Sequence, residues 1–140
     1  AVADPRTRGR FLLAHSEADG LVIYRTDTSG RRWGKVSTLT VPGRSASKVW
    51  LDWSPEGVLG LGWRATASSG YLFYGAVSYD AGKTWTVHRI SKAESPASQG
   101  VWVSGDDTSA VWVTKDRFYA TWGDWRGGSL QTWWGGFPLK

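Results

Sequence analysis

Short apolar runs alternate with polar, glycine-containing stretches along the whole chain. The runs include residues 11–15, 21–24, 58–64 and 71–77, and each has the length of a single β-strand. Between them lie segments such as Ser54-Pro55-Glu56-Gly57, whose residues are typical of tight turns. Short strands joined by such turns predict an all-β protein.

The predicted strands group into repeated units within one domain of 140 residues. The most complete unit covers residues 48–91, and an incomplete unit lies on either side of it, at 1–40 and 101–137. Within the central unit four strands are predicted, at 49–53, 58–64, 71–77 and 86–90. Four strands in about 45 residues is the size of one propeller blade, so the repeats indicate about three blades.

The turn between the last two strands of the central unit has a distinctive sequence, Ser78-Tyr79-Asp80-Ala81-Gly82-Lys83-Thr84-Trp85. Asp80 can accept hydrogen bonds from the backbone N–H groups of its own turn, and Gly82 can adopt a positive φ. Ser78 and Thr84 can tie the strand ends together through their hydroxyls. Trp85 is expected to bury its ring and hold the hairpin against the core.

This order, Ser-x-Asp-x-Gly-x-Thr-Trp, resembles the Asp-box, the bacterial neuraminidase repeat of sialidase-like β-propellers. A degenerate copy contains Thr26, Gly30 and Trp33, with Thr28 in the place of the aspartate. Residues 122–128 (Trp-Gly-Asp-Trp-Arg-Gly-Gly) resemble the Trp-x-Asp-x-Arg-x-Gly loop of the same superfamily. The resemblance covers nearly the whole chain and implies a partial propeller of about three four-stranded antiparallel blades.

A closed sialidase-like propeller has six blades, so the resemblance implies that another polypeptide or a second copy of the chain completes the ring. Open blades would expose apolar faces and strand edges that favour association. The alternative fold is a β-trefoil, because Gln131-Thr132-Trp133 resembles its Gln-x-Trp signature. We rank the trefoil second, since the other repeats lack that signature.

The resemblance places the Asp-box turn away from the ligand, which makes Asp80 structural. The ligand face would then carry the loops at 16–20, 41–48, 64–70, 91–100 and 124–128. From these loops we select Arg64, Asp124, Trp125 and Arg126 as ligand-binding residues. An arginine can grip a carboxylate through two hydrogen bonds, and a tryptophan ring can stack on a sugar. The alternative is that Asp124 and Arg126 pair across their own loop; Arg44 and Lys92 are weaker candidates.

Sialidases of the family use three arginines, a tyrosine nucleophile with a glutamate partner, and an aspartate acid/base. Arg64 and Arg126 can be matched to two of the arginines, but the catalytic residues are not assigned in this sequence. An exo-glycosidase activity would therefore need residues from the missing blades.

Composition narrows the choice of partners. The chain has no Cys, so disulfides and thiolate metal sites are excluded. It has 11 Trp, whose rings can pack in the core or stack on sugars. The net charge of +5 is scattered, which argues against nucleic acid but is compatible with an anionic glycan. His15 and His88 lack the spacing of metal ligands, and the sequence implies no cofactor. The polar turns at 27–29 and 105–109 offer oxygen ligands for calcium, although ordinary turns have the same composition.

No apolar run is long enough to span a membrane, and the Ala1-Val2-Ala3-Asp4 start without Met predicts a processed, secreted protein. The sequence therefore predicts part of a secreted carbohydrate-binding or glycan-processing propeller. The alternatives are a non-enzymatic propeller that serves as a protein-interaction scaffold, and a trefoil lectin.

Overall fold

The computed structural model describes residues 1–18, 20–96 and 109–140. These residues form β-strands joined by turns, and no helix occurs within the described ranges. The described strands are β1 (Val2–Ala3), β2 (Phe11–Glu17), β3 (Gly20–Thr26), β4 (Gly34–Leu39), β5 (Ser45–Trp53), β6 (Leu59–Ala67), β7 (Gly70–Ser78), β8 (Thr86–Arg89), β9 (Ser95–Pro96), β10 (Ala110–Val113), β11 (Arg117–Asp124) and β12 (Gln131–Pro138).

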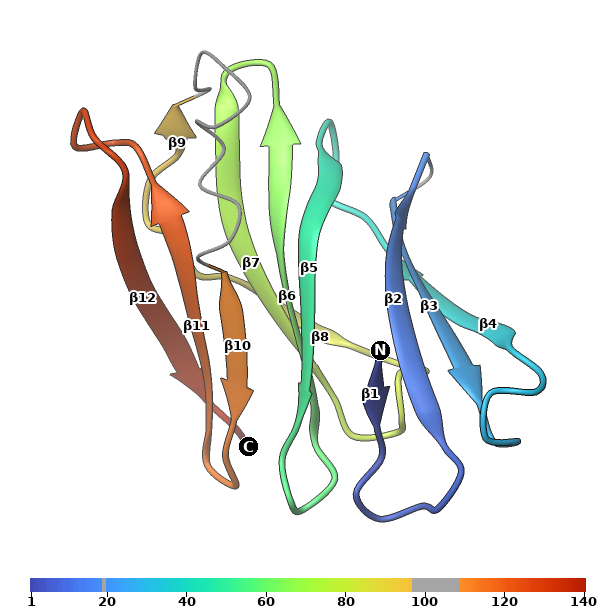
Figure 1. Ribbon diagram of the computed structural model, residues 1–140. Helices are drawn as coiled ribbons and strands as arrows, with labels where there is room; N and C mark the ends of the chain where they lie inside the picture. The colour runs from blue at the N-terminus through green and yellow to red at the C-terminus, as the bar shows by residue number, and fades with distance from the viewer. Residues whose placement is uncertain (19, 97–108) are drawn as a thin grey trace.

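The strands make three antiparallel sheets that follow one another in chain order. The first sheet has the order β1-β2-β3-β4, the second β5-β6-β7-β8 with β9 added to β7, and the third β10-β11-β12. Figure 1 shows the sheets standing side by side, from the blue first sheet to the red third sheet. The all-β prediction is confirmed, and the trefoil alternative is wrong, because the strands form separate consecutive sheets. The Gln131–Trp133 segment that suggested a trefoil lies within β12.

The first and second sheets pack face to face through one apolar cluster. Leu12, Leu21 and Ile23 from the first sheet are fully buried against Leu61 and Trp63 of β6. Alternate residues of each strand point to the same face, so this spacing of large apolar side chains follows directly from the strand period.

The second and third sheets meet at a face that is lined by glycine. Phe118 and Trp122 of the third sheet pack against Phe73 of β7, with the Phe73 and Trp122 rings stacked at 5.1 Å. A Cβ atom on Gly75 would lie 2.7 Å from Phe118, and one on Gly60 would collide with Val113. The backbone of the second sheet therefore lies directly beneath the rings of the third.

The turn between β7 and β8 is held by Asp80. Its Oδ1 atom accepts hydrogen bonds from the backbone nitrogens of Lys83 (3.0 Å) and Thr84 (2.9 Å), and Thr84 Oγ1 donates to Oδ2 at 2.6 Å. Ser78 Oγ accepts from the nitrogen of Gly82 at 2.9 Å, and Gly82 has a φ of 85°. Burial alone would raise the pKa of Asp80, but these hydrogen bonds outweigh it and lower the pKa below its ordinary value.

Trp85 lies at the seam between two sheets and is half-buried, whereas the sequence led us to expect full burial. Its Nε1 atom donates to the carbonyl of Gly82 and to Ser37 Oγ of β4, both at 3.0 Å. Ser37 Oγ in turn donates to the Gly82 carbonyl at 2.6 Å. The turn therefore ties the second sheet to the last strand of the first.

The equivalent turn of the first sheet, between β3 and β4, is held by threonine instead of aspartate. Thr26 Oγ1 accepts from the nitrogens of Thr28 (3.1 Å) and Gly30 (3.2 Å), and Thr28 Oγ1 accepts from Arg32 at 2.9 Å. The Asp27 carboxylate instead pairs with Arg10, which precedes β2, and with Arg25 of β3.

The two ends of the sheets carry different connections. In Figure 1 the β5–β6, β7–β8 and β10–β11 turns lie at the lower end, and the β6–β7 and β11–β12 connections at the upper end. β5 begins at Ser45, so the loop expected at 41–48 is shorter. Among the described residues, no helix is long and apolar enough to cross a membrane.

The glycine-lined face gives a direct test of the packing. We expect Gly60→Ala to lower the free energy of unfolding by about 1–3 kcal/mol, because the added methyl group overpacks the contact with Val113. Urea unfolding measures the change. Gly34→Ala is the matched control, since a Cβ atom at this position in β4 meets nothing within 4 Å. Equal stability of the two variants would contradict the close contact.

Candidate functional site

The upper end of the second and third sheets brings the selected residues together. Arg64, in β6, is only 2% exposed, and its guanidinium carbon lies 4.6 Å from the centre of the Tyr71 ring on β7. The Tyr71 hydroxyl donates a hydrogen bond to the carbonyl of Gly123, at the end of β11. A chain of contacts therefore runs from Arg64 to the residue that precedes Asp124.

Asp124 is fully buried and holds Arg126 in a fixed position. Asp124 Oδ1 accepts from the backbone nitrogen of Arg126 at 2.9 Å and from its Nε at 3.0 Å, and Oδ2 accepts from Arg126 Nη2. The indole of Trp122 donates to the same carboxylate at 3.1 Å. The alternative considered from the sequence, a pair across the loop, is therefore present in the structure.

The charges of this pair stabilise each other. Burial would raise the pKa of Asp124, but the hydrogen bonds from Arg126 and Trp122 lower it below its ordinary range. The hydrogen bond to Asp124 likewise raises the pKa of Arg126. Both groups are therefore charged at neutral pH, and the arginine is presented as a rigid cation.

Arg126 is also fixed on its other sides. Its guanidinium carbon lies 4.4 Å from the centre of the Trp133 ring, in the geometry of a cation–π contact, and Nη2 donates to the carbonyl of Ala93 at 3.0 Å. Among the described residues, no hydrogen bond occupies its Nη1 atom, so the two N–H groups of this atom are left for a ligand.

A hollow of about 540 Å³ opens beside this guanidinium. Its walls combine tryptophan rings with polar and cationic groups from β12 and from the segment after β8. The lining residues are Ile90, Lys92, Trp122, Arg126, Gln131, Thr132, Trp133, Trp134, Gly135 and Gly136. Rings beside a few donors are the usual composition of a small-molecule site.

Of the four residues selected from the sequence, Arg126 lines this hollow, and Asp124 lies behind it as its partner. The other two do not line it. Trp125 donates its backbone N–H to Ser95 Oγ at 2.9 Å, and its indole nitrogen is buried without a hydrogen-bond partner among the described residues. Arg64 lies deeper, under Tyr71. The ring beside Arg126 is instead that of Trp133, which sequence reasoning did not select, although adjacent tryptophans in a strand were a visible signal.

Of the two weaker candidates, Arg44 and Lys92, one lines the hollow and the other does not. Arg44 is committed to an ion pair with Glu94 at 2.8 Å and to the carbonyl of Ala65 at 3.2 Å. Lys92 lines the hollow.

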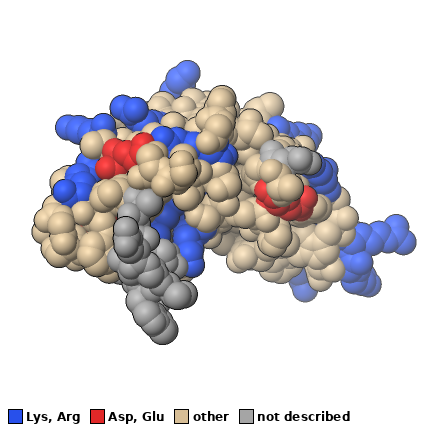
Figure 2. All heavy atoms as spheres, turned by 90° about the horizontal axis from the view of Figure 1, so that it is seen from above, with Lys and Arg blue, Asp and Glu red and all other residues tan. Residues whose placement is uncertain are grey.

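Figure 2 shows this end of the molecule, with Lys and Arg spread around it and Asp and Glu confined to small patches. The loop expected at 91–100 is described only as far as Pro96.

No metal site is evident in the described part of the chain, where no group of three or more His, Asp or Glu side chains is close enough to hold an ion. Asp27, considered for calcium, instead pairs with Arg10 at 2.6 Å and with Arg25 at 3.2 Å. The other calcium candidate, at 105–109, lies outside the described residues except for Ser109.

Comparison with solved structures identifies the fold. An α-L-arabinofuranosidase mutant from Fusarium graminearum, in complex with an iminosugar inhibitor, superposes with a TM-score of 0.65 at 15% identity. An α-L-arabinanase from Penicillium chrysogenum, complexed with arabinobiose, gives 0.62 at 19% identity. A protein of unknown function from Dyadobacter fermentans gives 0.56 at 17% identity. No protein-family model and no curated protein matches the sequence.

These comparisons show that the chain is a partial β-propeller. The match covers 90% and 89% of this chain but only 42% of the arabinofuranosidase and of the arabinanase, and 81% against 30% for the third protein. The chain therefore spans less than half the length of the structures it matches. The neighbours with stated activities are glycoside-hydrolase propellers, so the expected propeller fold is confirmed, whereas a sialidase relationship in particular stays a prediction.

The Asp124–Arg126 pair can be tested by a double-mutant cycle. We expect Arg126→Ala to destabilise the fold by about 3 kcal/mol, because it leaves the buried charge of Asp124 without its partner. Asp124→Ala should cost less, because the side chain of Arg126 is 19% exposed. The double variant should be more stable than the sum of the two losses predicts, with a coupling of about 1–3 kcal/mol. Because the folded-state pKa of Asp124 is lowered, the coupling is present above the unfolded pKa and is lost as pH falls through the folded one.

Chemical denaturation at several pH values measures this cycle. The matched control is Lys115 and Asp116, whose side chains are both 71% exposed and lie 3.8 Å apart. Their coupling is expected within about 0.5 kcal/mol. A coupling at Asp124 and Arg126 as small as that of the control pair would contradict the buried geometry.

Proposed function

We propose that the chain is part of a secreted carbohydrate-binding or glycan-processing propeller that binds its glycan at the upper end of the second and third sheets. One observation carries this proposal: a guanidinium, fixed by Asp124 and stacked on Trp133, borders an aromatic hollow of about 540 Å³. Two structural neighbours support it, since one is complexed with an iminosugar inhibitor and the other with arabinobiose.

The lining residues fit the chemistry of a sugar. The apolar face of a pyranose or furanose ring packs on an indole ring, while its hydroxyls require nearby donors and acceptors. Trp133 supplies the ring, and Gln131 supplies an amide that both donates and accepts. Lys92 and the two remaining N–H groups of Arg126 would favour a glycan with a carboxylate, such as a sialoside.

Cleavage of the glycan is the finer proposal. No nucleophile and acid/base pair is assigned in this chain, and Asp124 is fully buried and committed to Arg126. An exo-glycosidase activity would therefore use catalytic residues supplied by further blades. Binding without cleavage, in a scaffold for protein interaction, is the alternative that the same fold permits.

The third sheet supports the proposal that further blades complete the ring. The first and second sheets are each covered by the sheet that follows, but the outer face of the third carries Trp112, 65% exposed, and Trp134, 74% exposed. The Trp112 ring lies beside that of Tyr119, with ring centres 5.9 Å apart. Exposed rings on a sheet face mark an interaction surface. We propose that blades of a second copy or of a second polypeptide pack there.

Glycan binding is tested with a sialoside and an arabino-oligosaccharide as probes, measured by calorimetry. We expect Trp133→Ala and Arg126→Ala to weaken binding at least about tenfold, because each removes one wall of the hollow. Trp50→Ala is the matched control, since this tryptophan of β5 is exposed but does not line the hollow. Binding that is equally affected in all three variants, or that is absent for every glycan of a wider panel, would count against the site.

Ring completion is tested by the native mass of the protein from its natural source. We expect either twice the 15.4 kDa of one chain or a second polypeptide that purifies with it. Trp112→Glu should disrupt the assembly, because it places a charge on the exposed face of the third sheet. Val87→Glu, at an exposed position of β8 in the central sheet, should leave it intact. The mass of a single chain for the unaltered protein would contradict the proposal.

A further inference from the structure

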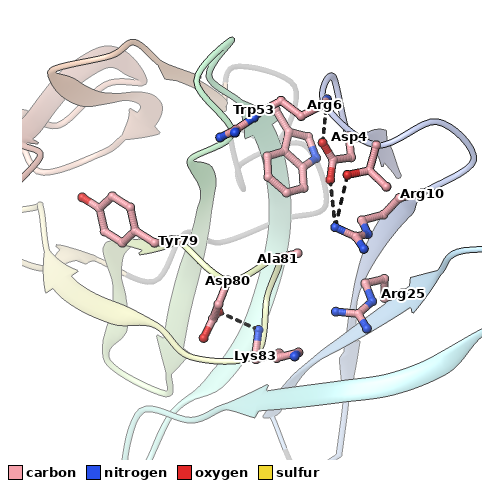
Figure 3. Close-up of a pocket in the computed structure, with 11 residues that line it drawn as sticks. Asp4, Arg6, Arg10, Arg25, Trp53, Tyr79, Asp80, Ala81 and Lys83 are labelled. Carbon is pink, nitrogen blue, oxygen red and sulfur yellow. Dashed lines mark hydrogen bonds and ion pairs between the residues drawn. The ribbon is translucent and has the colours of Figure 1, made fainter.

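A second hollow lies at the opposite end of the molecule, between the first and second sheets. It measures about 440 Å³ and is formed where the β1–β2 connection, the end of β5 and the β7–β8 turn converge. Figure 3 shows the side chains of Arg10 and Arg25 on one side of it and the turn with Asp80 and Lys83 on the other. The hollow lies at the seam between these two sheets, where their side chains do not fill the space.

The hollow is cationic. Four of its lining residues are Arg6, Arg10, Arg25 and Lys83, whereas its only carboxylates are Asp4 and Asp80. Asp80 is occupied by the hydrogen bonds of its own turn. Asp4 accepts from the backbone of Arg6 at 2.8 Å and from Arg10 at 3.3 Å. Positive charge therefore remains available for an anion.

Two of the cations are held in place by contacts outside the hollow. Arg10 Nε donates to Asp27 at 2.6 Å, and the same carboxylate accepts from Arg25 Nε at 3.2 Å. The hydrogen bond with Asp27 raises the pKa of Arg10. Within the described residues, the terminal nitrogens of Arg25 and the ammonium of Lys83 make no hydrogen bond or ion pair, which leaves them free to bind a ligand.

Aromatic surface borders these cations. Trp53 lines the hollow from the end of β5, and Tyr79 is exposed at its rim. The indole nitrogen of Trp53 is buried and has no hydrogen-bond partner among the described residues, so its polar edge is unsatisfied. Figure 3 shows this ring beside Asp4 and Arg10. An indole next to fixed cations fits a ligand that has both a flat apolar face and a negative charge.

We propose that this hollow binds an acidic sugar unit, with Arg25 and Lys83 holding its carboxylate or sulfate and Trp53 contacting its ring. The volume of about 440 Å³ accommodates a small saccharide and is within the range of small-ligand sites. The net charge of +5 favours the approach of an anionic polymer. The site lies at a different seam from the Arg126 hollow, shares no lining residue with it, and does not depend on the function proposed for it.

The test compares three probes of equal length: an oligouronate, a sulfated neutral oligosaccharide and the unsulfated neutral oligosaccharide. Affinity is measured by calorimetry for the unaltered chain and for Arg25→Gln and Lys83→Gln. We expect each variant to bind the anionic probes at least about tenfold more weakly. Arg32→Gln removes the same charge from an exposed turn outside the hollow, and should bind within about twofold of the unaltered chain.

Binding of the oligouronate alone identifies the carboxylate as the ligand group, and binding of the sulfated probe alone identifies the sulfate. Equal affinity for the neutral oligosaccharide, failure of both anionic probes, or an equal loss in Arg32→Gln overturns the proposal. Because Arg25→Gln also breaks a contact with Asp27, Lys83→Gln decides the result if the former lowers the melting temperature. Trp133→Ala should leave this binding unchanged, which separates the outcome from that of the other site.

Discussion

The close approach of neighbouring sheets is the constraint on which this structure depends. A sheet of three or four strands cannot bury both faces alone, so each must be covered by the next. At the seam between the second and third sheets, glycines at positions 60 and 75 bring the backbone of β6 and β7 beneath Val113 and Phe118. At the other seam, Gly82 fits under Leu12, and Trp85 and Ser37 join the sheets by hydrogen bonds. Side-chain size at the seams thus sets the spacing of the blades.

The same seams create both candidate sites. Where sheets spread apart at their ends, the gap is bordered by residues from two sheets and is closed by neither. At the upper end this places Arg126 and Trp133 of the third sheet opposite Ile90 and Lys92 of the second. At the lower end, Arg10 of the first sheet faces the Asp80 turn of the second. In each case ion pairs with a buried or shared carboxylate fix the arginines before any ligand arrives, which reduces the entropy lost on binding.

Much of the fold could be predicted because strand period and turn residues are local signals. The strand expected at 71–77 is β7, Gly70–Ser78, and the hydrogen bonds expected for Asp80 are present. β1 is too short to leave a pattern, and the start of β5 is polar and interrupted by a bulge after Ser47. Arg64, Asp124 and Arg126 do meet at one end, but Trp133 was missed. Which face of a strand borders a cavity depends on the neighbouring sheet, and that contact is not encoded in any single segment.

The third sheet shows how the packing constraint extends beyond the described residues. Its inner face, with Phe118 and Trp122, is as well packed as those of the other sheets, yet its outer face leaves Trp112 and Trp134 in solvent. Burying two such indoles would be worth several kcal/mol at about 25 cal/mol per Å², more than the typical contribution of a surface ion pair. Among the described strands, none pairs with the outer edge of β12, whereas β4 pairs with β3 and β8 with β7 in the first two sheets. A fourth strand would pair with the edge of β12, and a further blade would cover the face that carries Trp112 and Trp134. Either one alone would leave the other surface exposed.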